Sequence, residues 1–213
     1  MDKILDRLGL FDLIAVFLPG SIATSITILF DQIAFGFEIS KYVNTDDIIV
    51  FVIVSYFFGM ILQELGSLTY KYLINKQNAI LLRSLDTTRK SSSLTAAEKE
   101  AVQAIVRKEL RLSEVPDDNQ LFHYCRYSGG SSAHTDKEQS LAAMSLNLSL
   151  YFFFLSFLVG FWALSHKMAN LGVVTVFLIL IGILLFYRSI RYYSVRFVRV
   201  VRTFYYTYNK EHK

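Results

Sequence analysis

The chain has 213 residues, of which 53% are hydrophobic, 15% aromatic and only 19% charged, and its formal net charge is +4. Soluble globular domains carry about 25% charged residues. This composition, with a mean hydropathy of +0.38, excludes a disordered or collagen-like chain and argues against a water-soluble globule. Cys125 is the only cysteine, which excludes an intrachain disulfide framework and a cysteine-based zinc site. The class that remains is an integral membrane protein.

Four long runs without a charged residue predict membrane-spanning helices. A helix rises about 1.5 Å per residue, so roughly 20 apolar residues cross a hydrocarbon core about 30 Å thick. Inside that core every backbone N–H and C=O needs an internal partner, and a helix provides one. The sequence therefore predicts an all-α membrane protein with four transmembrane helices, at residues 13–30, 48–63, 141–165 and 171–187.

The distribution of Lys and Arg predicts the orientation of these spans. Of the 22 basic residues, only Lys41 and Lys167 lie in the loops after the first and third spans. The positive-inside rule then places both termini, and the segment between spans two and three, in the cytoplasm of a bacterial inner-membrane protein. A cleaved signal peptide is a poor alternative for the first run, because its n-region holds Asp2, Asp6 and Asp12 and no A-x-A-like site follows it.

The spans divide the chain into four parts. Residues 1–66 hold an amphipathic N-terminus and the first two spans, and residues 67–140 form a cytoplasmic helical insert. Residues 141–187 hold the last two spans, and residues 188–213 form a basic cytoplasmic tail. The apolar residues of 1–12 share one helical face, which suits either a short helix lying at the inner interface or the first turns of span one.

Helical signals continue through the insert. Two capping-box patterns predict helix starts there, namely Thr95 to Glu98 and Thr135 to Glu138. The first is expected to begin a helix that runs to about Leu112, and the second a helix that continues without a break into span three. The helix of span two is expected to continue through residues 67–85, and a further short helix is expected at 119–127.

Residues 171–208 are predicted to form one helix, since no Gly or Pro follows Gly182. At 100° per residue, the part beyond the span carries basic residues on one side, the arginine stripe: Arg188, Arg191, Arg196, Arg199 and Arg202. The opposite side is apolar and aromatic, and includes Tyr193, Phe197, Val200, Val201 and Phe204. An apolar face outside the bilayer needs a partner, which is the insert, another copy of the helix or the membrane surface.

The arginine stripe has two interpretations. Arginines next to a span bind anionic lipid, at about 1 kcal/mol per charge. Interleaved with Tyr192 and Tyr205, the same residues could meet an acidic partner protein or the phosphates of a nucleic acid. The lipid interpretation is favoured, and direct nucleic-acid binding is not expected.

Small and polar residues within the spans are candidates for helix packing or a kink: Pro19, Gly20, Ser55, Gly59, Ser145, Asn147 and Ser149. Small residues four positions apart allow helix backbones to approach closely in lipid. Pro19 and Gly20 suit a kink or a thin spot in the first span, and Asn147 is the deepest amide. Together with the long C-terminal helix, this spacing favours a homo-oligomer.

Motifs for catalysis and metal binding are absent from the sequence. The four histidines lack metal-ligand spacing, and no phosphate-cradling glycine loop occurs. His123, Cys125 and Arg126 lie together, as a hydrolase or nuclease site would require, but we interpret them as one face of a short amphipathic helix. No catalytic, cofactor or metal site is expected, and the protein is expected not to be an enzyme.

The arrangement resembles small four-span proteins of bacterial anti-phage defence operons, most closely the KwaA family of membrane subunits of the Kiwa system. The likeness rests on the opening LGLFDLIAVFLPG, the helical insert and the tail RYYSVRFVRVVRTFYYTY. Small membrane accessory proteins of RNA-targeting CRISPR systems are similar at the same level. The resemblance implies a non-enzymatic inner-membrane oligomer, a tetramer by this likeness, that senses infection and recruits a cytoplasmic DNA-binding partner subunit.

The sequence therefore favours a membrane sensor and scaffold, because most of the chain outside the spans and most of its basic residues lie on the cytoplasmic side. The alternative is a pore or channel effector that depolarises the membrane. In that reading Ser145, Asn147 and Ser149, with the break at Pro19 and Gly20, would mark the conducting path.

Overall fold

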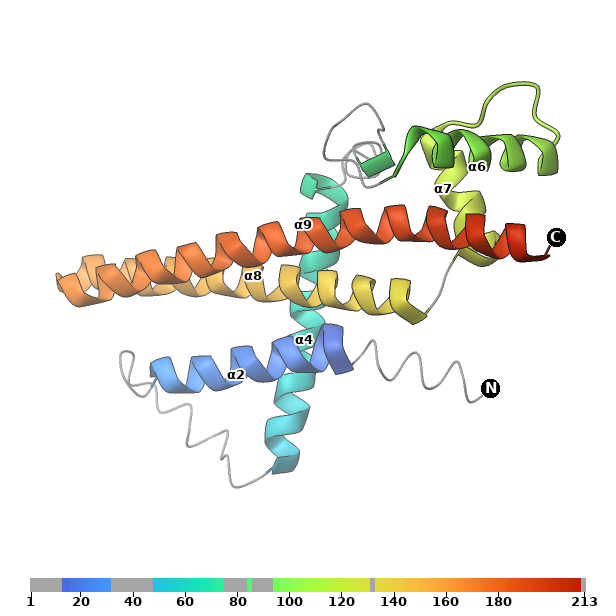
Figure 1. Cartoon of the computed structure of the whole chain (residues 1–213). Helices are drawn as coiled ribbons and strands as arrows, with labels where there is room; N and C mark the ends of the chain where they lie inside the picture. The colour runs from blue at the N-terminus through green and yellow to red at the C-terminus, as the bar shows by residue number, and fades with distance from the viewer. Residues whose placement is uncertain (1–12, 32–47, 75–83, 86–93, 131–132, 212–213) are drawn as a thin grey trace. The chain divides into compact units, whose positions relative to one another are not determined.

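The structure is a computed structural model that describes residues 13–31, 48–74, 84–85, 94–130 and 133–211. These residues form helices and turns, with no strand among them (Figure 1). In chain order the elements are η1 (Leu13–Phe17), α2 (Leu18–Phe30), α4 (Ile48–Thr69), η3 (Tyr70–Ile74), α6 (Ala96–Glu109), α7 (Asp118–Cys125), η5 (Arg126–Gly130), α8 (Ala133–His166) and α9 (Ala169–Glu211). The expected N-terminal amphipathic helix lies outside the described residues.

Four helical stretches are long and apolar enough to cross a membrane. They are Leu13–Phe30, Ile48–Tyr72, Thr135–His166 and Asn170–Glu211. The prediction of an all-α protein with four transmembrane helices is thereby confirmed. The helix expected over 171–208 is also confirmed, because α9 continues unbroken from Ala169 to Glu211.

The chain divides into two compact units. The first comprises Met1–Thr69 and Ser140–Ser189, and the second comprises Tyr70–Gln139 and Ile190–Lys213. The boundaries between the units fall after residues 69, 139 and 189. The boundaries expected from the sequence fall after residues 66, 140 and 187. Helices α8 and α9 each contribute to both units.

In the first unit, α2 and α4 cross where their backbones touch. A Cβ atom on Gly20 would meet the Ser55 carbonyl oxygen and would lie 2.7 Å from the backbone nitrogen of Gly59. Gly59 in turn faces the carbonyl group of Val16. Only residues without a large side chain allow this approach, so these small residues are used to pack two helices of one chain.

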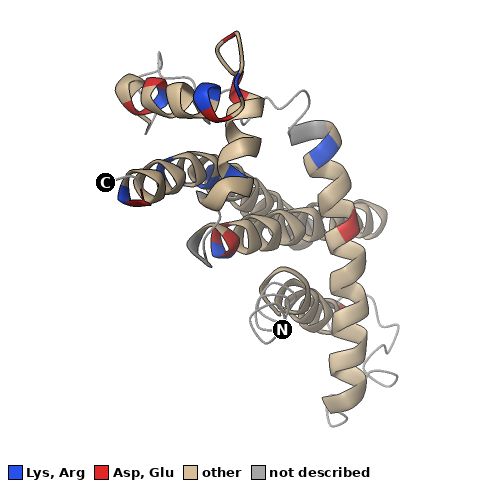
Figure 2. Ribbon diagram, turned by 90° about the vertical axis from the view of Figure 1, so that its right-hand side faces the viewer, with Lys and Arg blue, Asp and Glu red and all other residues tan. Residues whose placement is uncertain are grey.

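Apolar side chains both fill and coat the first unit. The core of its span helices is formed by Ala23, Leu62, Tyr151, Leu155, Val159 and Leu178. Large apolar side chains also face outward, with Phe157 69% and Phe161 65% exposed. A soluble protein rarely exposes so continuous an apolar surface, whereas lipid tails solvate it. Figure 2 shows that the helices of this unit carry almost no charged residues.

In the second unit, capping residues fix the starts of α6 and α7. The capping box at Thr95 and Glu98 is confirmed, and α6 begins at Ala96. Asp117 and Gln120 form another capping box at the start of α7, the short helix expected at 119–127. Helix α8 runs without a break into span three, as predicted, but it begins at Ala133, so Thr135 lies inside the helix and is not its N-cap.

The helix of span two changes from α-helical to π-helical where the second unit begins. It continues past Thr69 as the π-helical turn η3, Tyr70–Ile74. Residues 75–83 and 86–93 lie outside the described part of the chain, so the continuation expected through 67–85 is described only as far as Ile74 and again at Ser84 and Leu85.

The apolar side of the C-terminal part of α9 packs against helices of the insert. The ring of Phe197 lies 4.9 Å from that of Phe122 in an edge-to-face arrangement, and the ring of Phe204 lies 5.7 Å from that of Tyr124. Val200 and Val201 are buried in the same unit. Of the three partners that the sequence left open for this face, the structure therefore shows the insert.

Candidate functional site

Asn147 is the centre of a polar contact between three helices of the first unit. Its side chain is 1% exposed, and its Nδ2 donates to the backbone carbonyl of Ala15 at 2.8 Å and to Oε1 of Gln63 at 2.7 Å. One amide on α8 thus joins the start of the first span to α4. Away from water such bonds are retained, because the groups have no solvent with which to exchange.

Pro19 explains why the Ala15 carbonyl accepts a bond from another helix. A residue four positions after Ala15 would normally donate its N–H to that carbonyl, but proline has no N–H. The turn before it is π-helical, over Leu13–Phe17, which is a common adjustment near a disrupted helical bond. Asn147 Nδ2 supplies the donor that Pro19 lacks.

Gly66 leaves room for this contact. A Cβ atom on Gly66 would collide with the Asn147 side-chain oxygen. Any larger residue at this position would displace the amide from its two acceptors. Gly66 and Gln63 belong to the site, although the sequence analysis named neither of them.

Further polar contacts join the same helices. Ser149 Oγ donates to the Gly182 carbonyl at 2.8 Å, and Ser189 Oγ donates to the Ala142 carbonyl at 3.0 Å, both between α8 and α9. The hydroxyls of Thr27 and Tyr151 lie 3.0 Å apart, between α2 and α8. We call these contacts and those of Asn147 the polar seam.

The residues predicted to mediate helix packing all lie inside the first unit. Every one of the seven is buried: Pro19, Gly20, Ser55, Gly59, Ser145, Asn147 and Ser149. The Oγ atoms of Ser55 and Ser145 have no hydrogen-bond partner among the described residues. Since Gly20, Ser55 and Gly59 are used within one chain, their spacing no longer argues for self-association.

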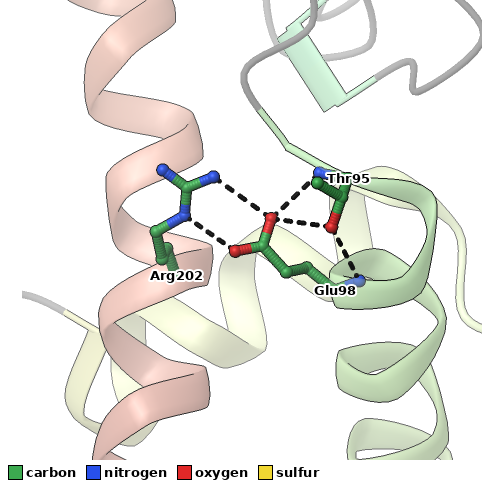
Figure 3. Close-up of polar contacts among 3 residues, drawn as sticks. All are labelled: Thr95, Glu98 and Arg202. Carbon is green, nitrogen blue, oxygen red and sulfur yellow. Dashed lines mark hydrogen bonds and ion pairs between the residues drawn. The ribbon is translucent and has the colours of Figure 1, made fainter.

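In the second unit, Arg202 on α9 binds the carboxylate that caps α6. Its Nε and Nη2 donate to the two carboxylate oxygens of Glu98 at 3.0 and 3.1 Å. The backbone N–H and the hydroxyl of Thr95 donate to the same carboxylate at 2.9 and 3.0 Å (Figure 3). The capping box is thus also the attachment point of α6 to α9.

Other ion pairs hold the same unit together. Arg199 pairs with Glu138 on α8. Lys99 Nζ lies 2.6 Å from the Asp118 carboxylate and donates to the Leu85 carbonyl at 3.0 Å. The helices of this unit are therefore joined by charges as well as by the aromatic pairs of α7 and α9.

The arginine stripe is not one continuous open surface. Arg188 in the first unit and Arg191 in the second are exposed. Arg196 is buried, with 8% of its surface exposed, while Arg199 and Arg202 bind carboxylates of the same unit. Three members of the stripe are therefore exposed, namely Arg188, Arg191 and Arg199.

Acidification should weaken the attachment of α6 to α9. Hydrogen bonds from Arg202, followed by those from Thr95, hold the pKa of the Glu98 carboxyl below its ordinary value of 4.5. A group whose pKa is lower in the folded state stabilises that state above its unfolded pKa, and the stabilisation is lost as the pH falls through the folded pKa. We expect the unfolding midpoint to drop below pH 4.5 by more in the wild type than in Glu98→Gln.

The check is a series of thermal unfolding curves in detergent micelles between pH 7 and pH 3. Glu100→Gln is the matched control, since Glu100 is an exposed carboxylate on the same helix. Equal acid sensitivity of the wild type and Glu98→Gln would contradict the role given to this ion pair.

The group formed by His123, Cys125 and Arg126 does not converge on one point. Cys125 is fully buried, and burial raises the pKa of its thiol to about 12, so the nucleophilic thiolate is scarce at neutral pH. His123 and Arg126 are exposed. The arrangement supports the interpretation of α7 as an amphipathic helix that packs its Cys125 side inward.

Several residues of these contacts were missed by the sequence analysis, among them Gln63, Gly66, Glu98 and Glu138 as bonding partners. A signal for Gly66 was present, because Ser55, Gly59, Leu62 and Gly66 repeat at helical spacing and share the buried side of α4. In the described part of the chain, no group of three or more His, Cys, Asp or Glu side chains is placed to hold a metal ion.

Compared with known proteins, the chain matches no family model, no curated protein and no solved structure.

Proposed function

We propose that the chain is a non-enzymatic membrane scaffold of a bacterial anti-phage defence system, which oligomerises in the inner membrane and docks a cytoplasmic nucleic-acid-binding partner. The defence role comes from the resemblance to the KwaA family. The scaffold role is supported by the fold itself: a multi-pass bundle of apolar helices and a second, charged helical unit.

One observation carries the scaffold role above the others. Helix α9 is 43 residues long and unbroken, and it contributes its first part to the membrane unit and its last part to the core of the second unit. Helix α8 is likewise shared. A change in the packing of the spans can therefore reach the second unit through two continuous helices, which is what a membrane sensor needs.

The docking surface that we propose is a groove beside the C-terminal end of α6. Its volume is about 650 Å³, and its lining includes Arg107, Lys108 and Arg111 with Leu112 and Val115. Arg111 has a φ of 51°, a left-handed conformation that glycine usually occupies after a helix.

A partner segment of acidic and apolar character fits this groove. Three cations face one carboxylate, that of Glu100, in its lining, so the groove attracts negative charge. Val115 is 61% exposed and offers apolar contact beside the charges. Charge complementarity of this kind selects partners and speeds their association.

The pore alternative finds less support in the first unit. The residues that would have marked the conducting path, Ser145, Asn147 and Ser149, are buried between helices. The side chains of Asn147 and Ser149 are engaged in bonds of the polar seam. A polar residue that cross-links helices serves packing, whereas a conducting path needs polar groups that face water.

The test is co-purification of the intact protein, in mild detergent, with the product of the neighbouring gene. We expect the wild type to retain the partner and the double substitution Lys108→Glu with Arg111→Glu to weaken binding about tenfold. Lys137→Glu, an exposed lysine of the same unit, is the matched control and should bind normally. Undiminished binding by the double variant would remove the groove from docking, and no binding by the wild type would contradict the scaffold role.

Two further measurements distinguish the alternatives. The mass of the detergent complex should exceed that of one chain if the protein oligomerises. Purified protein in liposomes should leave an ion gradient intact, whereas rapid dissipation of the gradient would favour the pore.

A further inference from the structure

Arg196 is a buried cation that has no bonded counter-charge among the described residues. Arg196 is 8% exposed, and its Nε has no hydrogen-bond acceptor in the described part of the chain. Its neighbours on the stripe, Arg199 and Arg202, bind carboxylates. The three arginines belong to the same helix, α9. Unlike the other two, Arg196 forms no ion pair with any described residue.

The groups around Arg196 come from four elements of the second unit. Arg126 of η5 and Asp136 of α8 are close enough to act on its charge, as are Tyr70 of η3 and Tyr193 of α9. The ring centroids of Tyr70 and Tyr193 lie 4.2 Å apart, and the ring planes are tilted by 35°. The cluster holds two cations, Arg126 and Arg196, and one carboxylate, that of Asp136, so its positive charge is in excess.

Leaving a guanidinium buried and unpaired is costly. A buried charge is tolerated when it is both paired and hydrogen-bonded, and a second cation nearby adds repulsion. Both difficulties are removed by an anion that accepts hydrogen bonds from Arg196 and balances Arg126. The planar, multiply donating guanidinium matches the oxygens of a phosphate group especially well.

We propose that Arg196 and Arg126 form a binding site for a phosphate group, flanked by the paired rings of Tyr70 and Tyr193. Arg196 supplies the buried hydrogen-bond donors, and the exposed Arg126 supplies the second charge at the rim. The phosphate group belongs either to the headgroup of an anionic lipid or to a soluble phosphate compound. This site is separate from the groove at α6, and it does not depend on the docking of a partner protein.

A ligand that binds only the folded state raises its stability in proportion to the logarithm of the ligand concentration. The experiment measures the apparent unfolding midpoint of the full chain reconstituted in phosphatidylcholine vesicles. One arm adds inorganic phosphate, with chloride at equal ionic strength as reference. The other arm adds phosphatidic acid to the vesicles. At a ligand concentration about 100 times the dissociation constant, the midpoint should rise on the order of 5 °C.

Substitutions assign the effect to the site. Arg196→Gln should abolish the rise and Arg126→Gln should reduce it, while Arg191→Gln, which removes an exposed arginine from the same helix, should preserve it. In phosphatidylcholine vesicles without added inorganic phosphate or phosphatidic acid, Arg196→Gln should leave the midpoint unchanged or raise it, because it removes an unpaired buried charge. A merely structural arginine would behave in the opposite way, with a lower midpoint in Arg196→Gln under all conditions.

Each outcome decides the proposal. A rise in both arms that requires Arg196 supports recognition of the phosphate group itself, a rise with phosphatidic acid alone identifies a lipid headgroup, and a rise with inorganic phosphate alone identifies a soluble ligand. No rise in either arm, or an equal rise in Arg196→Gln, would overturn it.

Discussion

Replacing Gly20 with alanine should destabilise the membrane unit by about 3 kcal/mol, toward the upper end of the usual range for overpacked interiors. The new Cβ atom would meet the Ser55 carbonyl oxygen and would lie 2.7 and 2.9 Å from the backbone nitrogen and Cα of Gly59. These are main-chain atoms of α4, which no side-chain rotation can move aside. The two helices must separate, and the contacts of their whole crossing weaken.

The matched control is Gly172→Ala. Gly172 lies in α9 of the same unit, and a Cβ atom there meets nothing within 4 Å. Alanine also favours helix more than glycine does, so this variant should be as stable as the wild type or slightly more so. The measurement is unfolding of the full chain by SDS in mixed micelles, followed by circular dichroism. Equal stability of the two variants would contradict the backbone contact between α2 and α4.

Replacing Asn147 with leucine should cost about 1–2 kcal/mol in the same assay. The change removes the donor that serves both the Ala15 carbonyl and Gln63. Hydrogen bonds between transmembrane helices are worth up to about 1.7 kcal/mol in double-mutant cycles, and two acceptors lose their partner here. Ser156→Ala is the control, because Ser156 donates only to Phe153 of its own helix.

A double-mutant cycle with Pro19 tests the reason for this contact. Pro19→Ala restores an N–H four residues after Ala15, so the carbonyl gains a donor within its own helix. The cost of Asn147→Leu should then fall by about half, a coupling on the order of 1 kcal/mol between the two sites. If the two changes prove additive, the Ala15 carbonyl is not the acceptor that makes Asn147 important.

Together these two predictions concern how the first unit is assembled. Gly20 sets how closely α2 and α4 approach, and Asn147 fixes how α8 meets them.

Much of the local structure was determined by the sequence alone. Charge-free runs long enough to cross a bilayer predicted four helices, because a helix satisfies its own backbone groups in lipid. The capping box at Thr95 and Glu98 acts within one turn, so its spacing was sufficient to predict the start of α6. The absence of Gly and Pro after Gly182 predicted the length of α9. The same local logic was wrong at Thr135, where the helix begins two residues earlier.

The candidate sites depended on the tertiary structure. Glu98 and Arg202 are 104 residues apart in the chain, and Asn147 and Ala15 are 132 apart. Periodicity shows which residues share a face of one helix, but the partner of that face follows from how helices cross and in which register. The crossing point and register are set where two backbones approach closely at small residues such as Gly20 and Gly59. Which residues of the facing helix lie against these glycines is determined only by the fold. The tertiary structure also gave similar arginines of α9 different surroundings: Arg191 is exposed, Arg202 binds Glu98 and Arg196 is buried.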